Sequence, residues 1–82
     1  MKKSKHLRVL IKREQKDVVN LTMPVASVKI LDTIMPDSVI PQLEAKGLSI
    51  RKIIDRVKEE NFAPQTLFEM EKEGKNYRVW IE

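Results

Sequence analysis

Residues 49–61, SIRKIIDRVKEEN, decide the fold of this chain. Apolar side chains recur in this stretch with the period of an α-helix, at Ile50, Ile53, Ile54 and Val57. Ser49 stands directly before the stripe, where an N-cap side chain accepts a backbone hydrogen bond. A helix with one apolar face cannot bury that face alone, so the flanking segments must supply a surface. We therefore expect an amphipathic helix packed against strands.

Four segments alternate apolar and polar side chains, as half-buried strands do: 7–12, 18–23, 66–71 and 77–82. We expect two hairpins, 7–23 and 66–82, the second closed by the turn sequence EGKN at 73–76. One face of these strands should lie against the helices, and its members are Leu7, Val9, Ile11, Val19, Leu21, Phe68, Met70, Val79 and Ile81.

Two further helices are expected between the hairpins, at 25–35 and 38–46. The first is rich in β-branched residues, so a strand through 28–31 is its competitor. Pro36 should end it, Asp37 or Ser38 should cap the second, and Gly47 suits the position after a helix end. The order β-β-α-α-α-β-β predicts an α+β domain, an antiparallel sheet of two hairpins with the helices packed on one face.

The length of 82 residues predicts one domain at 7–82, preceded by a basic flexible arm at 1–6. The chain has no cysteine, which excludes disulfides and thiolate metal sites and favours a cytoplasmic location. No stretch approaches the roughly 18–20 apolar residues of a membrane span. The apolar segment at 7–11 is also too short for a signal peptide.

Residues 1–20 carry seven basic and two acidic side chains, a balance of +5, whereas the rest of the chain carries −1. A basic surface of this kind can bind nucleic acid or an anionic membrane, or it can simply keep the chain soluble. Its members are Lys2, Lys3, Lys5, Arg8, Lys12, Arg13 and Lys16. A helix-turn-helix built from 38–47 and 49–61 is disfavoured, because acidic residues share the surface of its second helix.

No pattern of residues indicates catalysis. His6 is the single histidine, and neither a nucleophile nor a metal-ligand partner lies near it in sequence. The carboxylates fall on solvated helix and strand faces, and both glycines, Gly47 and Gly74, are explained by turns. We therefore expect no enzyme activity, no cofactor, no metal and no small-molecule substrate.

The face of the sheet turned away from the helices should carry four large apolar side chains, Leu10, Val18, Leu67 and Trp80. Aromatic anchors dominate protein interfaces, so we expect a contact centred on Trp80 with a protein partner or with a second copy. The alternative is that these residues are scattered, or that a register shift of one residue turns Trp80 inward.

The order of motifs resembles the SHOCT-like module of bacterial envelope-stress and regulatory proteins. The matching positions are Val19, Asn20, Leu21, Pro24, Leu43, Glu44, Gly47, Leu48, Ser49, Ile50, Ile53, Ile54, Glu59, Glu69, Glu71, Gly74 and Val79. This resemblance implies a non-enzymatic interaction or oligomerisation module, often joined to a larger envelope-associated or sensor domain.

Overall fold

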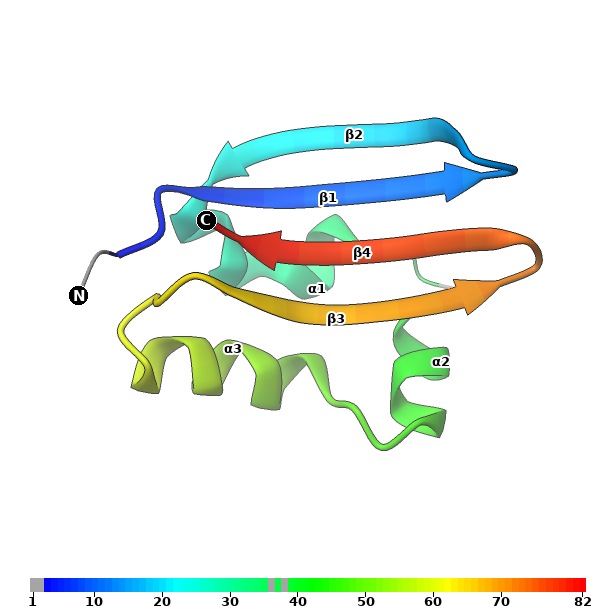
Figure 1. The fold of residues 1–82 in the computed structure, drawn as a ribbon. Coiled ribbons are helices and arrows are strands. Elements are labelled where there is room, and N and C mark those ends of the chain that lie inside the picture. Colours follow the sequence, from blue (N-terminus) through cyan, green and yellow to red (C-terminus); the bar gives the residue numbers. More distant parts are fainter. Residues whose placement is uncertain (1–2, 36, 38) are drawn as a thin grey trace.

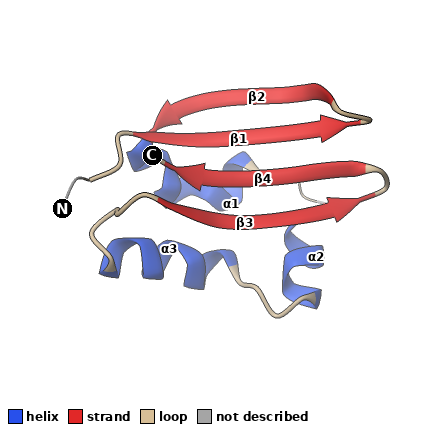
Figure 2. Cartoon of the chain, in the orientation of Figure 1, coloured by secondary structure: helices blue, strands red, loops and turns tan. Residues whose placement is uncertain are grey.

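The computed structural model describes residues 3–35, 37 and 39–82. Its four strands form one antiparallel sheet in the order β2-β1-β4-β3, with the helices beneath one face (Figures 1 and 2). This confirms the predicted α+β class. In chain order the elements are β1 (His6–Arg13), β2 (Lys16–Pro24), the 3-10 helix η1 (Val25–Ile30), α1 (Leu31–Ile34), α2 (Val39–Ala45), α3 (Ile50–Glu59), β3 (Gln65–Lys72) and β4 (Lys75–Ile81).

The first and last strands join the two hairpins at the centre of the sheet. Val9 of β1 pairs with Val79 of β4, and both side chains are almost fully buried. His6, which was expected in the basic arm, begins β1, and its N–H donates to the carbonyl of Glu82 (2.9 Å). Ser4 is buried, and its N–H donates to the carbonyl of Phe62 (2.8 Å). Of the expected arm, residues 1–2 lie outside the described part.

Helix α3 forms as its sequence predicts. All four members of its apolar stripe are buried, and Ser49 Oγ accepts a hydrogen bond from the N–H of Lys52 (3.4 Å). At the other end the N–H of Phe62 donates to the carbonyl of Val57 (2.9 Å), across Asn61 at φ 57°. This is a Schellman ending, in which asparagine takes the left-handed position usually held by glycine.

The segment 25–35 differs from the single α-helix expected there. It forms six residues of 3-10 helix in η1 and one α-helical turn in α1, and it buries Val28 and Leu31. β-branched side chains lose rotamer freedom in an α-helix, which weakens the preference of this segment for α geometry. The expected break at Pro36 and a cap at Ser38 lie outside the described residues. Helix α2 ends as predicted, with Gly47 at φ +80°.

The expected exposure of Leu67 is wrong. Thr66 pairs with Trp80 and Phe68 pairs with Val79, which leaves Leu67 as an extra residue in β3. This bulge brings the neighbours Leu67 and Phe68 into the core together, each only 4% exposed. A bulge adds one residue without changing the hydrophobic character of the strand, so the alternation of apolar residues did not reveal it.

Strand β2 also departs from expectation, because none of its nine residues is buried. Val19 and Leu21 lie opposite Ile11 and Val9 and share their helix-facing side of the sheet. Leu21 is nevertheless 44% exposed. Figure 1 shows α3 beside β3, at the edge of the sheet opposite β2. Val19 and Met23 of β2 are only partly buried against the core.

Candidate interaction surfaces

The sheet has one face that no described helix covers, and we call it the outer face. Strand register places on it the side chains that alternate with the buried ones. They are Arg8, Leu10 and Lys12 from β1, Asn20 and Thr22 from β2, Thr66, Glu69 and Glu71 from β3, and Asn76, Arg78 and Trp80 from β4. Charged and amide groups predominate, so this face is less apolar than the sequence suggested.

Trp80 lies on the outer face, as predicted, but its ring is contacted by two guanidinium groups. The Cζ atoms of Arg8 and Arg78 lie 5.4 Å and 5.1 Å from the ring centroid. Such cation–π contacts contribute about 0.5–1 kcal/mol each at exposed sites. The tryptophan is only partly exposed. Much of the apolar surface that it would offer to a partner is therefore in contact with its own neighbours.

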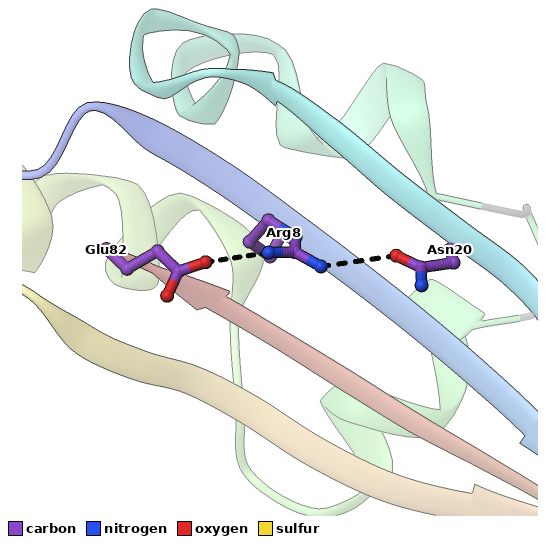
Figure 3. A network of polar contacts seen from close by, with 3 residues as sticks. All are labelled: Arg8, Asn20 and Glu82. Atoms are coloured by element: carbon purple, nitrogen blue, oxygen red, sulfur yellow. Dashed lines mark hydrogen bonds and ion pairs between the residues drawn. The ribbon is translucent and has the colours of Figure 1, made fainter.

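Arg8 connects three parts of the chain (Figure 3). Its Nη1 donates to Glu82 Oε1 (2.8 Å), and its Nη2 donates to Asn20 Oδ1 on β2 (3.3 Å). Arg78 makes a similar ion pair with Glu69 across β4 and β3 (3.3 Å). These side chains are between 29% and 61% exposed, so each pair contributes only about 0–1 kcal/mol. The network orients the groups on the outer face more than it stabilises the fold.

The structure does not bring the four predicted interface residues together. Leu10 is partly exposed and borders a shallow hollow of about 410 Å³ that Lys12 and Asn76 also line. Val18 is the unpaired residue of a bulge in β2 and is 52% exposed. Leu67 is in the core. A contact through Leu10, Val18 and Trp80 stays a prediction.

A second surface follows strand β2, and sequence reasoning missed it. The large apolar side chains exposed in the described part of the chain are Val18 (52%), Leu21 (44%) and Ile30 (53%), and all belong to β2 or η1. Val19 and Met23, also on β2, are partly exposed. We call the outward side of this strand, with its apolar side chains and its free backbone groups, the β2 edge.

The seven predicted basic residues are not one patch. Lys5 and Arg8 lie near the chain ends, whereas Arg13 and Lys16 flank the β1–β2 turn at the opposite end of the sheet. At the usual rise per strand residue, Arg13 lies about 17 Å from Arg8. Arg8 is already paired with a carboxylate. Lys12 lies on the outer face, Lys3 and Lys5 are exposed, and Lys2 lies outside the described residues.

Two lysines outside the predicted set, Lys72 and Lys75, lie at the same end of the sheet as Arg13 and Lys16. Lys75 is the cross-strand neighbour of Arg13 and also of Lys72. The sequence holds a signal for this grouping, because the turn sequences REQK at 13–16 and KEGK at 72–75 share one pattern. This signal alone does not predict the grouping, because the two turns lie side by side only through the pairing of β1 with β4.

Within residues 3–35, 37 and 39–82, no group of three or more histidine, cysteine, aspartate or glutamate side chains is placed to hold a metal ion. In the same part of the chain, no helix combines the length and the apolar character needed to cross a membrane.

These features define a small α+β domain in which two hairpins form one sheet. No described helix covers the outer face of this sheet, and no residue of its edge strand β2 is buried. The family model for the YvlB-like protein, C-terminal domain, matches residues 5–82, and the chain belongs to this family. The resemblance to the SHOCT-like module is therefore wrong, since SHOCT is a helical module of a different family. The motifs behind it were helix caps and turns, which recur in unrelated folds. No curated protein and no solved structure matches the chain.

Proposed function

We propose that this domain is a non-enzymatic protein-interaction module and that the β2 edge is its contact. The supporting observation is the location of the exposed large apolar side chains, Val18, Leu21 and Ile30, on β2 and on the helix that follows it. All three belong to one segment of the chain, 18–30, and exposed apolar side chains that gather on one part of a small domain are typical of a binding surface.

The two edges of the sheet differ in their protection. Edge strands expose unpaired backbone groups, and proteins guard them with charged side chains, proline or bulges. β3 carries Glu69 and Glu71, both exposed, in its second half. β2 has charges and a bulge only in its first three residues and a proline at its end, so the stretch VNLTM at 19–23 is uncharged and regularly paired. The least protected edge is thus also the most apolar one, which favours a strand as the partner.

A second copy of the chain fits this edge. In a two-fold antiparallel pairing centred on Asn20, Val19 of each copy lies opposite Leu21 of the other. Val19 and Leu21 both lie on the helix-facing side of the sheet, so the two apolar pairs of the dimer lie on the same side of the combined sheet. The same register places Lys16 opposite Pro24 and Asp17 opposite Met23, so no like charges meet. Self-association through β2 is therefore the form of the interaction that we propose.

Light scattering coupled to size exclusion tests this over a concentration series. We expect wild type to form a dimer that dissociates on dilution. We expect Leu21→Lys to stay monomeric, because a charged lysine on an edge strand would have to be desolvated when a second strand pairs with it. Thr33→Lys, an exposed change on α1, is the charge-matched control and should leave the dimer intact.

Trp80→Ser separates the two surfaces. If the β2 edge is the contact, Trp80→Ser dimerises like wild type. If Trp80→Ser is monomeric while Leu21→Lys still dimerises, the contact is the outer face and the proposal is wrong. A wild-type monomer at every concentration contradicts self-association altogether.

A further inference from the structure

The two hairpin turns share a conformation and an end of the sheet. In the β1–β2 turn Glu14 and Gln15 have φ of 52° and 67°, and in the β3–β4 turn Glu73 and Gly74 have φ of 51° and 77°. Two successive positive φ values are the mark of a tight type I′ hairpin turn. Figure 1 shows both turns side by side, at the end of the sheet away from the chain termini.

Strand register aligns the basic residues that flank these turns. Lys16 pairs with Arg13, Arg13 pairs with Lys75, and Lys75 pairs with Lys72. Each of the four strands thus contributes one cation to a single line across the sheet, which we call the cation row. At the usual spacing between strands the row is about 14 Å long.

The row has the parity of the helix-facing side of the sheet, because it lies two residues beyond Ile11, Tyr77 and Met70 on their strands, and each of its cations keeps some exposure to solvent. Arg13 and Lys16 are exposed, and Lys72 and Lys75 are partly exposed. Within the described part of the chain none of them is in an ion pair or a side-chain hydrogen bond, although Glu14 and Glu73 are their neighbours in sequence. Arg8, Arg56 and Arg78, in contrast, each have a carboxylate partner.

The cation row costs the fold stability through charge repulsion, and a role in solubility alone does not explain its place in the sheet. Like charges directly opposite each other on neighbouring strands are destabilising, and the row contains three such pairs. Lysines that merely guard a sheet belong on its edge strands. Here Arg13 and Lys75 lie on the two central strands, β1 and β4.

We propose that the cation row binds the sugar–phosphate backbone of a nucleic acid without regard to base sequence. A straight line of four cations complements a linear polyanion, because one chain of phosphates can follow the line across all four strands. A flat anionic membrane fits less well. Glu14 and Glu73 occupy the turns just beyond the row, so a plane that approaches the tips meets two carboxylates. Tyr77, the aromatic residue nearest to Lys75 in sequence, is only 8% exposed and offers no platform for base stacking.

Fluorescence anisotropy with a labelled single-stranded oligonucleotide at several salt concentrations tests the proposal. Four phosphate contacts predict that log K falls with log salt with a slope of about −2.8 for a single strand. The variant Arg13→Gln/Lys75→Gln should show a slope of about −1.4, because it retains half of the contacts. Both changes lie off β2, so they leave the proposed dimer contact untouched.

The matched control is Lys46→Gln/Lys58→Gln, which removes two exposed charges from the helical layer and should bind like wild type. A change of base sequence should alter affinity little. The proposal is overturned if the control weakens binding as much as the row variant, if no salt-dependent binding occurs at low salt, or if the row variant loses binding to phosphatidylserine vesicles while no nucleic acid binds. Circular dichroism verifies that every variant is folded.

Discussion

Val9 and Leu21 lie opposite each other on β1 and β2 and share one side of the sheet, yet Val9 is 2% exposed and Leu21 is 44% exposed. The edge of the core therefore lies along β2, where Val19 and Met23 are still partly buried against it. On one side of it an apolar side chain belongs to the core, and on the other side a similar side chain faces solvent. The β2 edge is the consequence, and the proposed contact follows from it.

This boundary predicts unequal costs for two truncations on neighbouring strands. Val9→Ala should lower the free energy of unfolding by about 2–3 kcal/mol, since it removes two buried carbon atoms and leaves a cavity. Leu21→Ala removes a larger group but should cost less than about 1 kcal/mol in the monomer, because that group is already half exposed. Urea denaturation at low protein concentration measures both. Equal losses would show that the helical layer covers β2.

The bulge in β3 makes Leu67 a core residue, and its truncation tests that assignment. Leu67→Ala should cost about 2–5 kcal/mol, as other buried leucines do. Thr66→Ala, one residue earlier and exposed, should stay within about 0.5 kcal/mol of wild type. Should Leu67→Ala prove as mild as the Thr66 variant, the leucine would belong to the outer face.

The cap of α3 predicts a smaller effect. Ser49→Ala removes the side chain that accepts a hydrogen bond from the N–H of Lys52. Because this bond is long, 3.4 Å, the expected loss of stability lies near the low end of what N-cap substitutions cost. We expect a loss of about 0.5–1 kcal/mol by thermal or urea denaturation, with Ser49→Asp close to wild type because aspartate caps equally well. An aspartate variant as unstable as the alanine variant would show that capping is not the cause.

The turn after α2 requires a left-handed residue. Gly47 has φ +80°, and a side-chain carbon added there meets no atom within 4 Å. Gly47→Ala should therefore cost about 1–2 kcal/mol through backbone strain alone. Gly47→Asn should cost less, since asparagine tolerates this conformation, as Asn61 does at the end of α3. If both variants had the same urea midpoint of unfolding as wild type, backbone strain at position 47 would be excluded.

Helix α3 and the hairpins could be predicted because their signals are local. The stripe from Ile50 to Val57, its Ser49 cap and the alternation in each strand depend only on nearby residues. The bareness of β2 could not be predicted, because it depends on how far the helices reach across the sheet. The burial of Leu67 required knowledge of a bulge, which leaves no mark on the alternation.

The candidate sites followed the same division. Trp80 was correctly placed on the outer face, because its parity in β4 is a local property. Its contacts with Arg8 and Arg78, and the alignment of Arg13 with Lys75, depend on β1 and β4 being neighbours. The order of strands in a sheet is set by long-range pairing, so no sequence pattern within one hairpin reveals it.

Amide hydrogen exchange, recorded residue by residue at low and high protein concentration, tests the β2 contact most directly. The unpaired amides of β2 between Val19 and Met23 should exchange more slowly as concentration rises, while the amides at the free edge of β3 serve as an internal reference and stay unchanged. Protection that grows in β3 instead, or exchange in β2 that is the same at both concentrations, would contradict self-association through the β2 edge.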